Sequence, residues 1–384
     1  MRRVGILGGG QLGTMLAESV QRLGARVRVF DPDPVAPATR QVVDVVTAPW
    51  HDRAALARFA SGCDVLTCDT EHVPLAALCG APWAGRFRPS LRAIAVAQHR
   101  VREKAFLAAA GMPLAAWRAG RGGVELSWAA EEFGFPCILK RATGGYDGHG
   151  QRLLRGSDDV EAARRDVGEW DEAWVLEEPV RLLAELSCIV VRGGGAATTF
   201  PILENAHRDH ILDATVVPAR LAPEVEDRAR AMALHLATAL DVEGLLTVEF
   251  FLGLRAGSES PALLVNELAP RPHNSGHVTR RACTLSQFDA LARVLLDLPV
   301  PPPALLDGAY AMANLLGEVG PLDAAAAQPE VVELTLYGKR TSAPRRKMGH
   351  VITHAADVET ALAAADAARE ALRPGAAAVQ RRSA

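Results

Sequence analysis

The first hundred residues alternate between short apolar runs and amphipathic stretches. The apolar run at 4–7 predicts a buried strand, and the helical spacing of leucine and valine over 11–23 predicts a helix that ends at Gly24. Further strands are predicted at 26–31, 43–48 and 63–69. Strands that alternate with helical patterns are typical of a parallel, doubly wound, Rossmann-like sheet.

The middle of the chain is dominated by strand patterns. Residues 89–111 predict one continuous helix, with Ser90 as its N-cap and Gly111 as its end. Between 115 and about 296 only two further helices are predicted, over 223–240 and 284–297. The strands are expected at 136–141, 151–155, 173–178, 185–191, 198–205, 245–253 and 261–268.

A proline-rich segment at 298–304 separates the last part of the chain from the middle. After it we expect short strands at 308–316, 330–338 and 349–354, and a helix near 357–372. We therefore predict an α/β fold with three domains: an N-terminal doubly wound domain over 1–100, a central domain over 101–297 and a small C-terminal domain over 298–384.

The composition excludes several classes of protein. With 49% hydrophobic and 23% charged residues, the 384-residue chain can bury large cores and is not disordered. A net charge of −3 gives no basic surface for nucleic acid, and no apolar run approaches the ~18 residues of a membrane span. The start lacks the apolar segment of a signal peptide, and no two of the six cysteines form a CxxC pair. We expect a cytoplasmic protein with free thiols and no zinc site.

Lysine is rare in this arginine-rich chain. Only four of the 42 basic residues are lysines. A lysine is then expected where a compact ammonium does something that a guanidinium cannot. The four are Lys104, Lys140, Lys339 and Lys347.

The first candidate for chemistry is the glycine turn Gly8–Gly13, a GxGxxG pattern between strand and helix. Such a turn lets the backbone approach a ligand, and the helix N-terminus favours anionic groups. Asp31 ends the next strand, where a dinucleotide-binding domain places its ribose-binding acid. A tight turn that binds nothing is the alternative.

The second candidate is the segment from Lys140 to Gln151, in which a strand ending in lysine leads into a loop with four glycines. Backbone N–H groups of such a loop can close over phosphates, and the lysine can reach them. Two to five residues suffice for a hairpin, so this loop is long for a structural turn. A plain surface hairpin remains the alternative.

The third candidate is the pair Glu249 and Glu267, each a lone carboxylate inside an apolar strand. Burying an unpaired carboxylate is costly, so each is expected to meet a cation. A short loop joins the two strands, which predicts an antiparallel pair that can place both acids on one face. Carboxylates beside a phosphate loop suit Mg²⁺; exposure, or pairing with an arginine, is the alternative.

Three further clusters combine polar side chains. The segment Arg271–His277 (RPHNSGH) offers a dense set of donors for a small oxyanion, or is an ordinary polar loop. Tyr337–Lys339 and Arg345–His350 offer cations for a substrate phosphate, or form a solvated basic turn. Cys68–Pro74 (CDTEHVP) ends a strand where open sheets bind ligands, or Asp69 or Thr70 caps a helix.

Together these stretches resemble the ATP-grasp superfamily and, within it, the carboxyaminoimidazole ribonucleotide synthase family, whose ATP- and bicarbonate-dependent activity belongs to purine biosynthesis. KRATGGYDGHGQ, VNELAPRPHNSGH and YGK…RRKMGH carry the resemblance most specifically, in the expected order and over nearly the whole chain. It implies an ATP-grasp fold, ATP and Mg²⁺ as cofactors, aminoimidazole ribonucleotide and bicarbonate as substrates, and a homodimer.

The resemblance also implies residue roles. Glu249 and Glu267 correspond to magnesium ligands. ATP is assigned to Arg100, Lys140, Gly145, Tyr146, Asp147, Gly148, His149, Gly150, Gln151, Glu177, Glu178, Pro179, Val180, Glu185, His207, Asn266 and Glu267. Bicarbonate is assigned to Arg271, His273, Asn274 and Ser275, and the ribonucleotide to Gln11, Leu12, Glu71, Tyr146, Asp147, Lys339 and Arg346.

The implied reaction has two steps, attack of bicarbonate on the γ-phosphate of ATP and capture of the activated carboxyl group by the amine of the ribonucleotide. The expected catalytic residues are Lys140 on the phosphates, Arg271 and His273 at bicarbonate, and Asp147 at the amine proton. Closure of the loop 143–150 would exclude water.

Several positions depart from the family's pattern, and rival functions stay open. Thr14 replaces an arginine, Asp69 and His72 replace a glutamate and an asparagine, Glu178–Pro179 is an unusual adenine-contacting hinge, and Arg345 replaces a glycine. The rivals are an ATP-grasp ligase with another acceptor, an NAD-dependent oxidoreductase, and a nucleotide-binding protein without catalysis.

Overall fold

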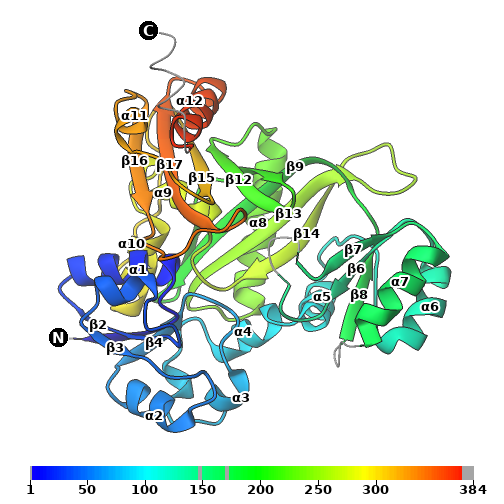
Figure 1. Ribbon diagram of the computed structural model, residues 1–384, viewed down its shortest axis with the longest axis horizontal. Helices are drawn as coiled ribbons and strands as arrows, with labels where there is room; N and C mark the ends of the chain where they lie inside the picture. Colours follow the sequence, from blue (N-terminus) through cyan, green and yellow to red (C-terminus); the bar gives the residue numbers. More distant parts are fainter. Residues whose placement is uncertain (1, 146–148, 169–172, 374–384) are drawn as a thin grey trace.

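The computed structural model describes residues 2–145, 149–168 and 173–373, and its N-terminal part contains a parallel four-stranded sheet (Figure 1). The strand order is β3-β2-β1-β4, as predicted for a doubly wound domain. The strands are β1 (Arg3–Leu7), β2 (Arg26–Phe30), β3 (Asp44–Val46) and β4 (Val65–Cys68). The helices are α1 (Gln11–Arg22), η1 (Pro37–Arg40), α2 (Arg53–Ser61), α3 (Leu75–Leu78) and η2 (Ala84–Arg86).

The single helix predicted over 89–111 is wrong, because the chain forms two helices, α4 (Leu91–Ala97) and α5 (Arg100–Ala109). Ser90 is the predicted N-cap of α4, accepting from Ala93 N. The break at Gln98–His99 has a tertiary cause: the Gln98 amide donates to the backbone oxygens of Glu71 and Val73, at 2.9 and 2.8 Å. These bonds tie the helix junction to the loop after β4.

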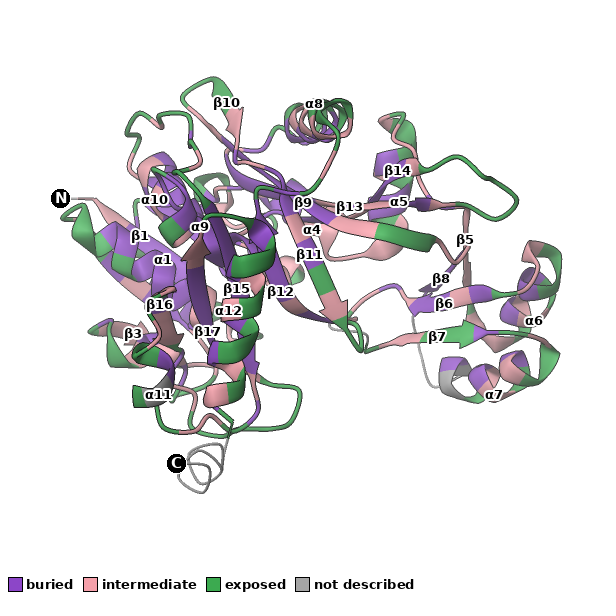
Figure 2. Ribbon diagram, turned by 90° about the horizontal axis from the view of Figure 1, so that it is seen from above, coloured by how far each residue is buried: buried purple, intermediate pink, exposed green. Residues whose placement is uncertain are grey.

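A small antiparallel sheet with two helices stands apart from the rest of the molecule (Figure 2). Its order is β5-β8-β6-β7. The elements are β5 (Trp117–Arg121), α6 (Gly122–Phe133), β6 (Cys137–Arg141), β7 (Gln151–Leu154), α7 (Ser157–Gly168) and β8 (Ala173–Glu177). The prediction of only two helices between 115 and 296 is therefore wrong. Two glycines begin α6, and α7 is mostly polar, so neither shows a wide apolar stripe.

A nine-stranded antiparallel sheet forms the centre of the molecule. Its path is β14-β13-β9-β11-β12-β15-β17-β16, and β10 pairs with β9. The first strands are β9 (Arg181–Gly193), β10 (Ala196–Thr199), β11 (Leu203–Arg208), β12 (Ile211–Val217), β13 (Gly244–Leu254) and β14 (Ala262–Ala269). The strands after the proline-rich segment, β15 (Ala309–Leu316), β16 (Val331–Leu336) and β17 (Lys347–Ala355), extend this same sheet.

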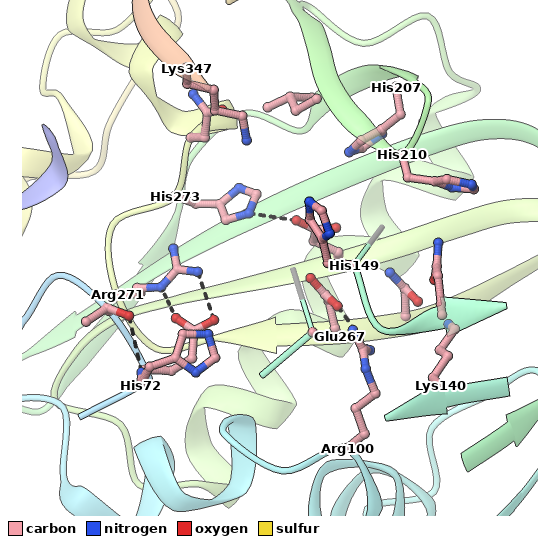
Figure 3. A pocket seen from close by; sticks show the side chains of 18 of the residues that line it. His72, Arg100, Lys140, His149, His207, His210, Glu267, Arg271, His273 and Lys347 are labelled. Atoms are coloured by element: carbon pink, nitrogen blue, oxygen red, sulfur yellow. Dashed lines mark hydrogen bonds and ion pairs between the residues drawn. The ribbon is translucent and has the colours of Figure 1, made fainter. Parts of the chain in front are cut away.

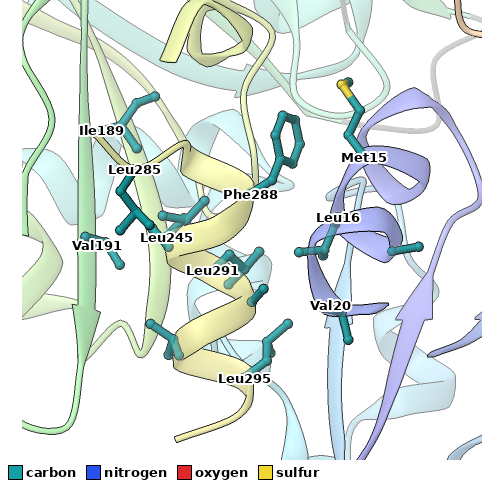
Figure 4. Packing of buried hydrophobic residues seen from close by; sticks show 14 of the residues in the cluster. Met15, Leu16, Val20, Ile189, Val191, Leu245, Leu285, Phe288, Leu291 and Leu295 are labelled. Atoms are coloured by element: carbon teal, nitrogen blue, oxygen red, sulfur yellow. The ribbon is translucent and has the colours of Figure 1, made fainter. Parts of the chain in front are cut away.

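Helices cover this sheet and join it to the N-terminal part. They are α8 (Pro223–Ala239), η3 (Ser275–Val278), α9 (Thr279–Ala282), α10 (Gln287–Leu295), α11 (Asp323–Ala326) and α12 (Val358–Ala371). Figure 4 shows α10 between α1 and the strands: Leu291 and Leu295 lie between Leu16 of α1 and Val191 of β9. One apolar cluster therefore fixes the glycine turn relative to the central sheet.

Candidate active site

One cavity of about 970 Å³ lies where the three sheets meet, and most predicted site residues line it. Figure 3 shows Arg271 and His273 on one side, Lys140 and Arg100 on the other, and Glu267 between them. The predicted residues on its wall are Gln11, Leu12, Glu71, Arg100, Lys140, Gly145, His149, Gln151, Glu177, Glu178, Val180, Glu185, His207, Glu249, Asn266, Glu267, Arg271, His273, Asn274, Lys339 and Arg346.

Some predicted residues are not on this wall. Gly150, Pro179 and Ser275 do not line the cavity, and Ser275 is fully buried beneath it. Tyr146, Asp147 and Gly148 lie outside the described residues. The assignment of Ser275 to bicarbonate therefore has no direct contact to support it.

Lys140 sits at the end of β6 in a buried cluster of charges. Its ammonium donates to Glu177 Oε2 at 2.8 Å, and the ammonium of Lys104 lies 3.3 Å from Glu177 Oε1. Burial opposes ionisation of Glu177, but the two lysines outweigh it and hold its pKa at about 2. Burial lowers the pKa of Lys140 against the pull of Glu177. One carboxylate therefore compensates two ammonium groups, so this cluster has an excess of positive charge beside the cavity.

Arg100, at the start of α5, connects this cluster to the acidic pair. Its guanidinium lies 3.4 Å from Glu267 Oε2, and its backbone N–H donates to Ala142 O at the start of the glycine loop, at 2.8 Å. Burial, followed by the nearby Glu267, raises the pKa of Glu103 to about 8. Glu103 also accepts the backbone N–H of Leu268 at 2.6 Å, which fixes α5 against β14.

The two acids predicted to bind magnesium are directly opposite each other on antiparallel strands. Glu249 of β13 pairs in register with Glu267 of β14, so both side chains point to the same face of the sheet. Glu249 is largely buried, whereas the side chain of Glu267 is 38% exposed, more open than expected for a residue in an apolar strand. The predicted alternative, a pairing with an arginine, also occurs, between Glu267 and Arg100.

The donors at this position fit a hard divalent cation. Next to Glu267 on β14, Asn266 adds a buried amide oxygen that has no hydrogen-bond partner among the described residues. All three donors are oxygens, the ligands that Mg²⁺ prefers, and Mg²⁺ usually takes only one or two carboxylates from the protein. Within residues 2–145, 149–168 and 173–373, no three His, Cys, Asp or Glu side chains form a self-sufficient metal cluster. The site therefore suits an ion that nucleotide oxygens help to hold.

On the other side of the acids, Arg271 and His273 each contact a carboxylate. The guanidinium of Arg271 makes a two-point ion pair with Glu71, and its Nη2 lies 3.1 Å from Oε1. Burial opposes ionisation of Glu71, but Arg271 outweighs it and lowers the pKa of Glu71 to about 2. His273 Nε2 lies 2.7 Å from Glu249 Oε1, and this contact outweighs burial and lowers the pKa of Glu249 to about 2.

Two carboxylates of the protein itself accept hydrogen bonds from backbone N–H groups of the glycine turn. Gly9 N–H donates to Asp31 Oδ2 at 2.6 Å, and Gly10 N–H and Gly13 N–H donate to Asp69 Oδ2 at 2.8 and 3.2 Å. Burial raises the pKa of Asp69 to about 7. Asp31 and Asp69 therefore take the place at the helix N-terminus that a dinucleotide's pyrophosphate needs. This arrangement argues against the NAD-dependent oxidoreductase.

A group of cations closes the end of the cavity formed by the C-terminal strands. Lys339, Arg345, Arg346 and Lys347 all line it. Lys339 donates to the backbone oxygen of Lys347 at 2.6 Å. Tyr337 and His350 of the same motif are buried instead, and the Tyr337 hydroxyl lies 2.9 Å from His350 Nδ1.

Seven wall residues were missed by the sequence interpretation: Trp50, Ala115, Ile138, Leu182, His210, Leu212 and Phe251. His210 lies at the tip of the β11–β12 hairpin with φ of 65°, beside His207 (Figure 3). His207 Nδ1 lies 3.1 Å from Glu185 Oε2. Burial alone would lower the pKa of His207, but Glu185 raises it. A short turn between two strands was the only available signal for His210.

Comparison with known proteins identifies the family. Residues 1–98 match the ribonucleotide synthetase pre-ATP-grasp domain, 105–288 the ATP-grasp domain, and 311–364 the phosphoribosylaminoimidazole carboxylase C-terminal domain. N5-carboxyaminoimidazole ribonucleotide synthase of Bacillus subtilis (strain 168) is 37% identical over 91% of this chain and 90% of its own length. The chain belongs to this family. The enzyme of the same name from Staphylococcus saprophyticus is 34% identical over 92% of this chain and 93% of its own.

Solved structures of the family share the whole fold. The ADP complex of an N5-carboxyaminoimidazole ribonucleotide synthetase superposes with a TM-score of 0.86 at 35% identity, covering 96% of both chains. The Aspergillus clavatus synthase in complex with ADP and 5-aminoimidazole ribonucleotide gives 0.84 at 32% identity, over 96% of this chain and 97% of the other. The predicted ATP-grasp fold with an N-terminal pre-ATP-grasp domain and a C-terminal domain is confirmed. Among the described residues, no helix is long and apolar enough to cross a membrane.

Proposed function

We propose that this protein carboxylates 5-aminoimidazole ribonucleotide with ATP and bicarbonate, giving N5-carboxyaminoimidazole ribonucleotide, ADP and phosphate in purine biosynthesis. The observation that carries the proposal is the position of the acid pair Glu249 and Glu267. It lies between the lysine cluster around Glu177 and the donors Arg271 and His273, in one cavity. ATP, as the phosphate donor, and bicarbonate, as the small oxyanion, can therefore bind next to each other at these two acids.

In the first step a bicarbonate oxygen attacks the γ-phosphorus, the bond to the β-phosphate oxygen breaks, and ADP leaves. Lys140 and Arg100 are placed to bind phosphate oxygens and to offset the charge that develops on them. Lys140 and Lys104 both contact Glu177, so Lys104 still compensates this carboxylate when Lys140 binds a phosphate oxygen. The hinge residues Glu178 and Val180 line the same side of the cavity for the adenine.

Glu249, Glu267 and Asn266 would hold Mg²⁺, which supplies charge neutralisation for the nucleotide oxygens when bound. The chain's own residues do the rest around these acids. His273 and Arg100 contact the two carboxylates and orient them. Because Glu249 has a pKa of about 2, it stays ionised over the whole range in which the enzyme is expected to work.

In the second step the amine nitrogen of the ribonucleotide forms a bond to the carboxyl carbon, the carbon–oxygen bond to phosphate breaks, and the amine loses a proton. Arg271 orients bicarbonate, and Glu71 fixes Arg271 by its two-point ion pair. Lys339 and Arg346 supply charge for the ribonucleotide phosphate. Asp147 remains our candidate for the proton acceptor.

The proposal is tested by measuring phosphate release while ATP, bicarbonate and 5-aminoimidazole ribonucleotide are omitted in turn. We expect full turnover only with all three, and the carboxylated ribonucleotide as product. Unchanged turnover without the ribonucleotide, or with another amine in its place, would point to an ATP-grasp ligase with a different acceptor.

We further propose a homodimer in the cytoplasm, with domains over 1–100, 101–297 and 298–384. The family resemblance supports the dimer. Sedimentation equilibrium of the purified chain tests it, and a monomer mass at micromolar concentration would contradict it.

A further inference from the structure

One face of the central sheet carries a continuous row of polar side chains across five strands. Glu249 of β13 is in register with Glu267 of β14 on one side and with Ser187 of β9 on the other. On the next pair of strands, Asn205 of β11 is in register with Thr215 of β12. Asn205 also lies opposite Glu185, two residues from Ser187, so it belongs to the same face.

The row is connected to His273, whose ring is held at both nitrogens. Nε2 lies 2.7 Å from Glu249 Oε1, the contact drawn as a dashed line in Figure 3. Nδ1 lies 2.8 Å from the hydroxyl of Ser275, and that hydroxyl lies 3.1 Å from the hydroxyl of Ser187. Ser275 and Ser187 are both fully buried, so water does not replace these contacts.

The connection continues beyond Ser187 to β12, the third strand from β13. The Asn205 amide donates to Ser187 Oγ at 2.6 Å, and the Thr215 hydroxyl donates to Asn205 Oδ1 at 2.9 Å. Thr215 is fully buried and Asn205 is 7% exposed. Five hydrogen-bonding groups therefore form one chain from Thr215 to the His273 ring.

The chain fixes the orientation of the ring at both nitrogens. Ser187 Oγ accepts from the Asn205 amide and from the Ser275 hydroxyl, which holds the Ser275 oxygen beside His273 Nδ1. On the other side of the ring, Nε2 meets a carboxylate oxygen of Glu249. Turning the ring would break one of these two contacts.

The backbone of His273 is fixed as well. Its N–H donates to Gln287 Oε1 at 2.9 Å, and its carbonyl accepts from Gln287 Nε2 at 2.7 Å. Gln287 is fully buried at the start of α10. A Cβ at Gly276 would lie 2.4 Å from Gln287 Oε1, so the turn after Asn274 needs glycine for this clamp to form.

We propose that Ser275, Ser187, Asn205 and Thr215 form a positioning relay that holds the His273 ring with its Nε2 edge against Glu249. The relay occupies Nδ1, so His273 meets the site through Nε2 alone, where it orients Glu249 and bicarbonate. Ser275 acts through His273 and not on the substrate. The inference about bicarbonate rests on the proposed function, whereas the relay itself does not depend on it.

The relay is tested first by ¹⁵N NMR of histidine-labelled, ligand-free protein at pH 8, with His273→Gln identifying the His273 signals. We expect Nδ1 to be hydrogen-bonded. Ser275→Ala should move the Nδ1 signal toward that of a nitrogen without this partner, and Ser187→Ala should move it less. Thr247→Val is the matched control, because Thr247 is equally buried on β13 and its hydroxyl has no hydrogen-bond partner among the described residues.

Steady-state kinetics then distinguish a positioning role of Ser275 from a role in packing alone. We expect Ser275→Ala to raise KM for bicarbonate ~10- to 100-fold, the size of effect that follows when a residue that orients a site residue is removed. KM for ATP should be nearly unchanged. Ser187→Ala should give a smaller rise, and Thr247→Val none. Unchanged spectra in Ser275→Ala, or an equal effect of Thr247→Val, would overturn the relay. An intact relay in a protein that does not use bicarbonate would overturn the proposed function alone.

Discussion

The buried carboxylate of Glu177 gives the sharpest prediction about stability. Its side chain is 3% exposed, and it serves the ammonium groups of Lys104 and Lys140, which are 1% and 9% exposed. The variant Glu177→Gln keeps the shape of the side chain but removes the one carboxylate that, among the described residues, forms ion pairs with both lysines. We expect it to destabilise the fold far more than loss of a surface ion pair.

The size of the effect follows from the cost of an uncompensated buried charge. Breaking a buried ion pair by removing one partner costs about 3–5 kcal/mol. Alternatively, a lysine can become neutral by releasing its proton. For a group with an ordinary pKa of ~10.4, this costs about 4–5 kcal/mol at pH 7. Both routes give a loss of about 3–5 kcal/mol in the free energy of unfolding.

Removing a lysine instead should cost less. In Lys104→Met, Glu177 keeps Lys140 at 2.8 Å, and the main loss is the bond from Lys104 to Asn266 O at 3.2 Å. An unpaired buried carbonyl costs about 1–3 kcal/mol. In the double variant Glu177→Gln/Lys104→Met only one uncompensated ammonium remains, so its loss should be smaller than the sum of the single losses by about 1–3 kcal/mol.

Denaturant unfolding followed by fluorescence and circular dichroism measures these free energies. Glu161→Gln is the matched control, because Glu161 and Arg164 form an exposed pair at 2.6 Å, worth about 0–1 kcal/mol. Equal stability of Glu177→Gln and Glu161→Gln would refute the reasoning. If the stability losses of the two single variants simply added in the double variant, this would also refute the reasoning. It would mean that Glu177 and Lys104 do not compensate each other's charge.

Three other predictions concern the site and the C-terminal strands. Glu267→Ala should lower ADP formation ~100-fold or more with an unchanged circular dichroism spectrum, and near-normal ADP formation would contradict the metal assignment. Lys339→Ala should raise KM for the ribonucleotide, and a change confined to KM for ATP would show that the substrate phosphate lies elsewhere. His277 and His350 are buried with lowered pKa values, for His277 well below 6.5, because burial disfavours their charged forms. Below pH 6.5 the unfolded chain therefore binds protons at these two histidines that the folded chain does not, which lowers the free energy of unfolding, whereas Asp69 and Glu103, with pKa values raised to about 7 and about 8, act in the opposite direction. The parent protein should therefore lose more free energy of unfolding between pH 7 and pH 5 than His277→Phe, and equal losses in denaturant unfolding would contradict this.

Local patterns predicted the acid pair and most strands, for a physical reason, but missed β5 and β12 and joined β10 and β11 into one strand. A short loop between two apolar strands requires an antiparallel pair, and the side-chain alternation then places Glu249 and Glu267 on one face. Most of the other elements followed from the same alternation of apolar runs and helical spacing, but α6 and α7 did not. The split between α4 and α5 was not predictable, because it depends on Gln98 reaching the loop after β4.

Side-chain partners were beyond the reach of sequence patterns. Arg271 and Glu71 are 200 positions apart, and their ion pair depends on how the N-terminal sheet docks on the central sheet. Asp69 fills the glycine turn of α1 through a contact between separate strands. Ser275 was assigned to bicarbonate from its place in a polar motif, but its burial behind His273 is a property of the folded sheet.

The central claim is that bicarbonate itself attacks the γ-phosphate beside the two acids. Bicarbonate labelled with ¹⁸O tests this directly, because the attacking oxygen remains on phosphorus when the carbon–oxygen bond breaks. With ATP and 5-aminoimidazole ribonucleotide present, the account predicts one labelled oxygen in each phosphate released, measured by mass spectrometry before the label exchanges with water. Phosphate without label would mean that water attacks the nucleotide, and the account would be contradicted.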